Sequence, residues 1–553
     1  MSAHAAYRRQ PVQQQFAQNL KTITIPAPTR GIIQTENDAF MTPGGAVVQT
    51  NWVSTMKGVK LRGGCERWCV LPETTPVISA FEYVSGNNQR MFAGNATKLY
   101  DVTTTVPSEI KSGQASGNYW SVQLSNQGGN FMLVGNDAGD FLLRTADGIA
   151  FFLLSGVIGN AGDGFPNVTY NPATLPPGVT QGRSLVYAWK YRGHIFFIQQ
   201  NSMNAWYLPI DAVGGQLNLI PLSGAAAKGG KLLFGATWSI DAGDGIDDKC
   251  VFATDQGELL IFTGSNPGDS ANWRQEGRYQ IGAPLGMNAH MLLGGDLLIM
   301  TVDGIVPISA AITKDSGALD LAMITKPIKQ LWRDEVAITA KRAAPWTLKK
   351  WDEYGGIFVA APMGTGSHKR CLAVNNGTGA WCTLTWDVTC LLRSRADMFF
   401  GTQGGIIMQA DRTGYDDGLP YTATLVGGWE LFQSGAAQTT WHQARAVFSA
   451  RASDPFVPQL SATTDYVVVI PPPPEIGPDP GLAEVWDEGL WDVAHWDMPA
   501  PGRPPLRNTL WISIGMSGFA HAPIVQVQVG QLARPQVELI AISTTQETGG
   551  VNV

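Results

Sequence analysis

The stretch "VFATDQGELLIF" (residues 251–262) predicts two short apolar strands joined by a Thr-x-x-Gly turn. The chain repeats this pattern in "LLIMTVDGIVPI" (297–308) and in "MFFGTQGGIIMQ" (398–409), so the turns lie at Thr254/Gly257, Thr301/Gly304 and Thr402/Gly405. A tight reversal between strands needs a residue that tolerates a positive φ, and glycine adopts it without a steric penalty. The three stretches are therefore predicted to be β-hairpins of one kind.

Four further stretches extend the series. "RMFAGNATKLYDV" (90–102) and "NFMLVGNDAGDFLL" (130–143) each set an apolar strand before Gly-Asn, and Gly94 and Gly135 lie 41 residues apart. The hairpin-like stretches "HIFFIQQNSMNAWYL" (194–208) and "GGIFVAAPMGTGSHKRCLAV" (355–374) fill the intervals. One propeller blade takes about 40–50 residues. The seven hairpins between residues 90 and 410 therefore predict a β-propeller of six or seven blades, with a series of β-sandwiches as the alternative.

The composition agrees with a mainly β fold. The 553 residues include 63 glycines, 34 prolines and 18 tryptophans, and only 15% are charged, which is poor material for long helices. The propeller is predicted over residues 78–418, with an inserted loop at 157–184 and an amphipathic helix at 325–338 whose Ile328, Leu331, Trp332 and Val336 face inward. Residues 1–77 are predicted to form an N-terminal arm with leading strands.

A second β unit is expected over residues 419–553, placed so that it helps to close the ring. Its strand-like segments alternate apolar and polar residues, and a Pro-rich, Trp-rich insertion interrupts them at 471–500. Within that insertion, "VWDEGLWDVAHWD" (485–497) holds three Trp-Asp pairs. WD-repeat propellers place this pair about 40–45 residues apart, whereas Trp486, Trp491 and Trp496 recur every five residues. The insertion is therefore predicted to lie outside the propeller, with its tryptophans packed on the chain's own surface or on a neighbouring subunit.

Charge and cysteine content exclude several classes of protein. The formal charge of −7 and the lack of a long basic run argue against a protein that reads nucleic-acid sequence. The six cysteines, scattered as Cys65, Cys69, Cys250, Cys371, Cys382 and Cys390, predict reduced, mostly buried thiols. Cys65 and Cys69 have no second Cys or His pair at zinc-ligand spacing. No export signal or apolar run of membrane-spanning length occurs, which predicts a protein made and kept soluble in a cytoplasm.

The search for catalytic and metal-binding motifs leaves one weak candidate. Asp241, Asp244, Asp247 and Asp248 concentrate hard oxygen ligands in "DAGDGIDD", but the order of an EF-hand loop is missing, so a polar turn is the alternative to a bound cation. The seven histidines (His4, His194, His290, His368, His442, His495 and His521) show no zinc-hydrolase spacing, and no nucleophile elbow or phosphate loop occurs. The single turn "GSNPGDSANW" (264–273) departs from the sialidase box in its order. No catalytic residue, cofactor or metal site is predicted, and we expect no enzymatic activity.

Four stretches of the chain resemble the tail nozzle proteins of short-tailed phages, also called tail tubular or packaged-DNA-stabilising proteins. They are "PAPTRGI" (26–32) with "NWVSTMKGVKLRGG" (51–64); "RMFAGNATKLYDV" with "YWSVQLSNQGGNFMLVGN" (119–136); the block from Thr237 to Pro267 with Trp273, Ile281–Gly286 and "GGDLLIMTVDGIVPIS" (294–309); and "VQVGQLARPQVELIAIS" (527–543). These are strand-and-turn patterns that span most of the chain.

The resemblance implies a structural virion protein, assembled in the host bacterial cytoplasm and located in the phage tail. Its implied partners are further copies in a hexameric ring, the portal and adaptor proteins above it, tail fibres or spikes, and DNA that passes through without specific binding. A ring of net negative charge fits this role, because phosphates bound by Lys or Arg would hold the DNA back. Two other classes stay open: a receptor- or polysaccharide-binding tail component, in which Trp486, Trp491 and Trp496 stack on sugars, and a propeller hydrolase with paired carboxylates.

Overall fold

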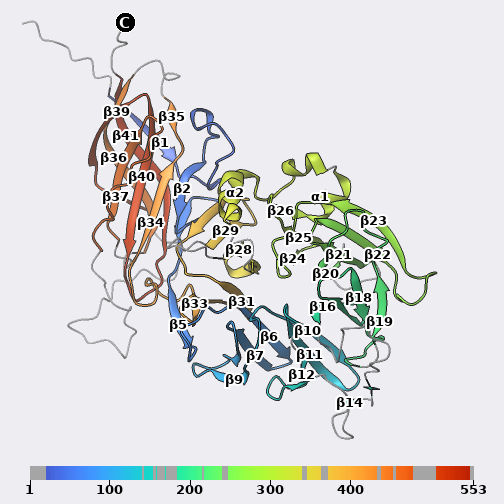
Figure 1. Cartoon of the computed structure of the whole chain (residues 1–553). Helices are drawn as coiled ribbons and strands as arrows, with labels where there is room; N and C mark the ends of the chain where they lie inside the picture. The colour runs from blue at the N-terminus through green and yellow to red at the C-terminus, as the bar shows by residue number, and fades with distance from the viewer. Residues whose placement is uncertain are drawn as a thin grey trace, which may run out of the picture.

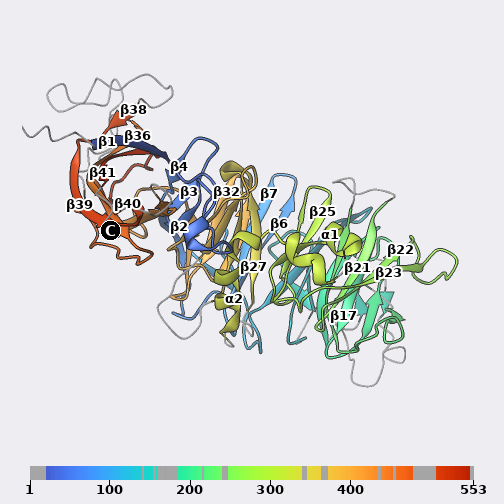
Figure 2. The ribbon, with the colours of Figure 1, turned by 90° about the horizontal axis from the view of Figure 1, so that it is seen from above.

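The chain folds into a ring of small β-sheets and a separate two-layered β unit. Our computed structural model describes residues 20–139, 142–153, 157–158, 168–169, 184–214, 217–239, 247–314, 316–338, 345–362, 371–431, 438–451, 456–476 and 506–548. Figure 1 shows the ring built from the middle of the chain, in blue through green to yellow-orange, beside the unit that contains the last strands, in orange and red. The N-terminal strands, in dark blue, lie between the two parts and within the second one (Figures 1 and 2).

The ring is a β-propeller made of four-stranded antiparallel units. Within the described residues, six such units and one three-stranded sheet follow each other along the chain. The first three are β6 to β9 (Ser79–Ser85, Asn88–Gly94, Leu99–Asp101, Ser108–Lys111), β10 to β13 (Tyr119–Asn126, Gly129–Asn136, Leu142–Thr145, Phe152–Leu153) and β16 to β19 (Leu185–Tyr191, His194–Gln199, Asn204–Tyr207, Asn218–Pro221). The propeller arrangement confirms the predicted fold class.

The remaining blades occupy residues 232–410. They are β20 to β23 (Leu232–Trp238, Lys249–Thr254, Glu258–Thr263, Arg274–Gln280), the three-stranded β24 to β26 (His290–Leu293, Asp296–Met300, Ile305–Pro307), β27 to β30 (Thr347–Trp351, Gly356–Ala360, Cys371–Asn375, Trp381–Leu384) and β31 to β33 (Cys390–Ser394, Asp397–Gly401, Ile406–Ala410). The first strands of successive sheets contact one another around the centre, for example β31 with β6 and β10 with β16.

Each hairpin predicted from the sequence is the second and third strand of one of these sheets. In the Thr-x-x-Gly turns, the N–H of the glycine donates to the threonine carbonyl, at 3.1 Å for Gly257 to Thr254 and 3.4 Å for Gly405 to Thr402. Gly257 has φ +78°, as the prediction requires. The local turn chemistry therefore marks the same position in every blade that carries the motif.

The ring is closed by an N-terminal strand. β5 (Cys65–Val70) pairs antiparallel with β33 and supplies the fourth strand of the last blade. The Trp68 indole N–H donates to the Val102 carbonyl in the next blade at 2.9 Å. The expectation that the C-terminal unit helps to close the ring is therefore wrong, because the pairing edge of β33 is already occupied by β5.

The second unit is a sandwich of two sheets. One contains β1 (Leu20–Pro26), β3 (Trp52–Ser54), β4 (Val59–Leu61), β36 (Thr439–Ala450), β38 (Leu506–Asn508), β39 (Ile512–Gly518) and β41 (Val537–Thr548). The other contains β2 (Ala46–Thr50), β34 (Tyr421–Gly427), β35 (Glu430–Leu431), β37 (Pro458–Thr464) and β40 (Ala520–Val529). Their facing side chains, including Phe448, Leu539, Leu425 and Val525, form one buried cluster.

The N-terminal residues are integrated into both units, which changes the predicted picture of an arm. β1, β3 and β4 belong to one sheet of the sandwich, and β5 belongs to the propeller. β2 pairs with β34 of the sandwich and also with β30 of the propeller, so that one nine-stranded sheet runs through both units. Residues 20–77 therefore join the two units, because each of their strands pairs with a partner far along the chain.

Short helices lie between strands. They are η1 (Asp38–Phe40), α1 (Ile308–Thr313), η3 (Ser316–Leu321), η4 (Lys326–Ile328), α2 (Lys329–Ala337) and η5 (Asp352–Tyr354). η4 and α2 confirm the predicted helix at 325–338, and Ile328, Leu331, Trp332 and Val336 are all buried. No helix in the described ranges is long and apolar enough to cross a membrane.

Two predicted irregular regions lie partly or wholly outside the described residues. Of the predicted loop 157–184, the structure describes the short strands β14 (Val157–Ile158) and β15 (Val168–Thr169) and the terminal Ser184. The Trp-Asp stretch 485–497 lies outside the described residues.

Candidate functional site

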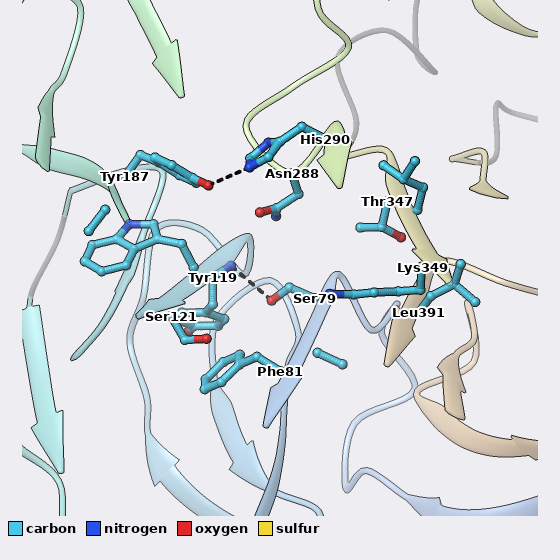
Figure 3. A pocket seen from close by; sticks show the side chains of 14 residues that line it. Ser79, Phe81, Tyr119, Ser121, Tyr187, Asn288, His290, Thr347, Lys349 and Leu391 are labelled. Carbon is cyan, nitrogen blue, oxygen red and sulfur yellow. Dashed lines mark hydrogen bonds between the residues drawn. The ribbon is translucent and has the colours of Figure 1, made fainter. Parts of the chain in front are cut away.

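The first strands of the blades surround a cavity at the centre of the propeller. It measures about 190 Å³, well above the 10–15 Å³ that one water molecule requires. The lining side chains come from six of these strands, β6, β10, β16, β24, β27 and β31, and from Asn288 just before β24. Figure 3 shows them converging on the cavity. Its lining residues are Ser79, Ala80, Phe81, Tyr119, Trp120, Ser121, Tyr187, Ala188, Asn288, His290, Thr347, Leu348, Lys349 and Leu391. None of them is an aspartate or a glutamate.

Lys349 brings a positive charge to this cavity. Its side chain is exposed although it lies at the centre of the ring, in the central channel that the first strands of the blades surround. The surrounding protein lowers the pKa of Lys349, and the negative charge of Glu82 partly opposes that shift. Glu82 itself accepts a hydrogen bond from Gln89 Nε2 at 2.8 Å. No carboxylate of the described residues lies within the 4.0 Å of the Lys349 ammonium that defines an ion pair.

His290, on the strand β24 that neighbours β27, contacts two aromatic residues. Its ring stacks on Phe234 with centroids 4.3 Å apart and planes 9° from parallel. Its Nε2 lies 3.2 Å from the Tyr187 hydroxyl, with which it forms a hydrogen bond. Burial, with a smaller effect of the Lys349 charge, lowers the pKa of His290 to about 4. His290 is therefore a neutral group near neutral pH, and Lys349 supplies the positive charge of the lining.

Polar groups continue from the cavity to one mouth of the channel. Asn288 Nδ2 donates to Asn118 Oδ1 at 2.9 Å, and Asn118 Nδ2 donates to Asp137 Oδ2 at 3.0 Å. Asn118 and Asp137 line a larger hollow of about 460 Å³ at this mouth, together with Lys231 and Asp255. Lys231 Nζ donates to Asn201 Oδ1 at 3.1 Å. The mouth therefore carries both charges, whereas the cavity below it carries only a positive one.

The cavity has the chemistry of a binding site and lacks a nucleophile activated by a base. The Ser79 hydroxyl donates to the Gly117 carbonyl at 2.7 Å and accepts from the Tyr119 N–H at 3.0 Å, so it cross-links neighbouring strands. General base catalysis needs a base within hydrogen-bond reach of the group it deprotonates. In the described part of the chain, the bond of His290 Nε2 goes to Tyr187, whose pKa burial raises well above its usual value. The described lining therefore offers hydrogen-bond donors and one cation to a ligand.

The residues singled out by the sequence lie elsewhere. Asp241 and Asp244 are outside the described residues, whereas Asp247 is exposed and Asp248 is buried. The Asp248 carbonyl accepts hydrogen bonds from Tyr191 and Arg192, as expected for a residue at a turn. No group of three or more His, Cys, Asp or Glu side chains that could hold a metal ion occurs in the described ranges. No sequence signal indicates that Lys349 lines a cavity, since "TLKKW" does not reveal which lysine faces the ring centre.

The cysteines are buried structural side chains. Cys65 and Cys69 both lie on β5, and all six thiols are free. Burial raises the pKa of Cys69 to about 12 and raises the pKa of Cys65 further above its usual value. The predicted burial of the thiols is confirmed. The ring of Tyr191 contacts that of Trp273 edge to face, with ring centroids 5.9 Å apart. This contact anchors the "GSNPGDSANW" turn, which follows β22.

A second polar cluster joins the propeller to the sandwich. Arg62, which is fully buried, donates from Nη1 and Nη2 to the two oxygens of Asp416 at 2.8 and 2.6 Å. Its Nε donates to Asn51 Oδ1 at 2.7 Å, and its guanidinium lies 3.9 Å from the ring centre of Tyr421. Beside it, Asp411 accepts from Tyr354 and pairs with Arg534 Nη2 at 2.6 Å. This junction cluster, Arg62, Asp416, Asp411, Arg534 and Tyr354, therefore ties together segments from both units.

Comparisons with known proteins find only distant structural likenesses. No protein-family model and no curated protein matches the chain. Among solved structures, it is similar to the computationally designed Ika8 protein (10% identity, 62% of this chain and 99% of that chain, TM-score 0.33). It is also similar to YCF48 from Cyanidioschyzon merolae (9%, 62% and 98%, TM-score 0.34) and to Sqt1 of Saccharomyces cerevisiae (10%, 66% and 86%, TM-score 0.33). Likenesses at this level of identity carry no statement about function.

Proposed function

We propose that this chain is a structural subunit of a phage tail nozzle, a ring that extends the DNA-ejection conduit below the portal and adaptor and helps to retain packaged DNA. The observation that carries the proposal is where the resembling stretches fall. "NWVSTMKGVKLRGG" supplies Arg62 of the junction cluster with its acceptor Asn51, and "VQVGQLARPQVELIAIS" supplies Arg534 of the same cluster. The two stretches that begin and end the resemblance meet where propeller and sandwich are joined.

A joined two-part subunit suits a component that bears load during DNA passage. The junction combines a buried two-pronged ion pair, the Asp411–Arg534 pair and a sheet that continues through β30, β2 and β34. Relative motion of two domains is the default when their interface is small and polar. Here, main-chain pairing and buried charges both oppose it. Such a subunit transmits force between its two ends without relying on a flexible linker.

The charge of the chain supports passage of DNA without retention by the protein surface. The net charge is −7, and each phosphate held by Lys or Arg would add to salt-dependent binding. The proposal therefore includes weak, non-specific contact with DNA. It also includes contacts of the ring with adaptor proteins above it and with fibres or spikes around it.

Electron microscopy of the purified full chain and of virions tests the proposal. We expect a closed ring with the hexameric symmetry of the resembling family, coaxial with the tail. Monomers at all concentrations, or trimeric fibres at the tail periphery, would overturn it. A glycan array run with the same preparation separates the alternative: saccharide binding without ring formation would assign the chain to the receptor- or polysaccharide-binding class.

A second measurement distinguishes a failed ring from a misfolded subunit. Arg62→Met breaks the junction, whereas Arg67→Met removes the exposed pair that Arg67 of β5 forms with Asp417. If the joined subunit is the building block, Arg62→Met reduces the fraction of rings in micrographs and Arg67→Met does not. Equal ring yields from both variants would contradict the role given to the junction.

A further inference from the structure

We propose that the central cavity of the propeller is a binding site for a small oxyanion, such as phosphate, sulfate or a carboxylate, held by Lys349 with Thr347 and Asn288. This inference does not depend on the proposed nozzle function, because it concerns the isolated chain. The site is a cavity of about 190 Å³ whose lining contains a lysine and no carboxylate. An anion with three or four oxygens and accompanying water fits this volume.

Lys349 provides the charge that the ligand needs. Its ammonium has three donors and, among the described side chains, no carboxylate within ion-pairing distance. Figure 3 shows the side chain extending from β27 across the cavity toward Ser79. The ammonium of the neighbouring Lys350 is already paired, since its Nζ lies 2.7 Å from Asp352 Oδ1. Two consecutive lysines therefore differ in whether their charge is already neutralised.

Thr347 gives an independent sign of a missing ligand. The side chain lines the cavity and is only 8% exposed, and its hydroxyl is buried without a hydrogen-bond partner in the described part of the chain. A buried hydroxyl left without a partner costs free energy, so such groups are normally bonded to protein, water or ligand. Thr347 and Lys349 alternate along β27 and so share one face of the strand. An oxyanion in the cavity would accept from both.

Asn288 and the His290–Tyr187 pair continue the lining from β24, the strand that neighbours β27, to β16. Asn288 already donates to Asn118, which fixes its amide at the cavity wall. His290 is kept neutral by burial and by the charge of Lys349. The ionisable groups around the site include Lys349, His290, Tyr119 and Tyr187 of the lining, Cys390 on β31, and Glu82 on β6, which accepts a hydrogen bond from Gln89. Binding of an anion next to Lys349 offsets its positive charge, so the pKa of His290 rises when the site is filled.

Calorimetric titration of the purified full chain with inorganic phosphate, sulfate and acetate, in chloride buffer near neutral pH, tests the site. We expect saturable binding of at least one of them at one site per chain. Lys349→Met is expected to weaken the affinity for the anion at least about tenfold, because hydrogen bonds between charged groups are stronger than those between neutral groups. Lys350→Met, the matched control, should leave the affinity within about twofold. The three probes distinguish a phosphate-type from a carboxylate-type ligand.

Thr347→Val and histidine-labelled NMR keep the test decisive if Lys349→Met does not fold. The valine variant keeps the shape of the side chain and removes its hydroxyl, and should weaken binding several-fold. The imidazole signal of His290 should titrate at higher pH when the anion is bound. Absence of binding for all three probes, equal loss in Lys350→Met, or an unchanged His290 titration on saturation would each overturn the proposal. Ring formation has no bearing on any of these readouts.

Discussion

Arg62 and Asp416 form a two-pronged ion pair, with Nη1–Oδ1 at 2.8 Å and Nη2–Oδ2 at 2.6 Å, at the place where the propeller meets the sandwich. The Arg62 side chain has no exposed surface, whereas 23% of the Asp416 side chain is exposed. The same guanidinium also donates to Asn51, to the Gly63 carbonyl and to Thr385. One side chain therefore connects three separate segments.

Arg62→Met is expected to destabilise the protein by about 3–5 kcal/mol, because breaking a buried pair leaves its partner and several acceptors unsatisfied. Arg67→Met serves as the control, since the Arg67–Asp417 pair has side chains 50% and 36% exposed and such pairs contribute about 0–1 kcal/mol. Urea unfolding followed by circular dichroism compares the two midpoints. Similar midpoints for both variants would contradict the importance of the buried pair.

Gly257→Ala is expected to cost more than about 3 kcal/mol. The glycine has φ +78°, a conformation that costs an L-residue roughly 1–2 kcal/mol, and an added Cβ would lie 2.3 Å from the Ile281 carbonyl oxygen. Gly418 has nearly the same φ, +79°, but an added Cβ there meets nothing within 4 Å. Gly418→Ala should therefore cost only the backbone strain. Thermal melting of both variants separates the cost of backbone strain from the cost of the clash. Equal losses of stability in the two variants would show that the turn at Gly257 relaxes and removes the clash.

The thiols are expected to resist modification in the folded protein. Burial raises the pKa of Cys69, Cys382 and Cys390 to about 12, and thiolate is the reactive form. A colorimetric thiol reagent at mildly alkaline pH should find no fast-reacting group in the native chain and all six after denaturation. A rapidly reacting thiol in native protein would show that one strand, such as β5, opens.

The blades could be predicted from the sequence because their signal is local. A Thr-x-x-Gly turn between two apolar runs needs only a few consecutive residues, and it marks the second and third strands wherever it occurs. The helix α2 was predictable for the same reason, since its buried residues recur with helical spacing. Fold class and the order of hairpins followed from such short-range patterns.

The contacts that close and join the fold could not be predicted. β5 pairs with β33 although Cys69 and Ile407 are more than 300 residues apart in the chain, and neither strand carries a mark of its partner. The residues of the candidate site depend on that closure. Strand alternation predicts that Lys349 and Lys350 face opposite sides, but only the assembled ring decides which one reaches the cavity.

His290 is expected to make the protein less stable as the pH falls from about 6.5 to about 4. Its pKa is lowered from 6.5 to about 4 in the folded state, so the unfolded chain binds more protons across this interval and stability rises with pH. A tenfold change in proton affinity corresponds to about 1.4 kcal/mol, so the lowering of the pKa from 6.5 to about 4 sets an upper limit of about 3.5 kcal/mol for this residue. Urea unfolding at several pH values, compared between the wild type and His290→Gln, isolates its share, since the lowered pKa of His521 acts equally in both proteins. Lys349→Met removes the positive charge that helps to keep His290 neutral, so the pKa of His290 in the folded state should rise toward 6.5. The pH interval over which His290 changes the stability should therefore become narrower. An identical pH dependence in the wild type and His290→Gln would show that His290 is not shielded in the folded channel.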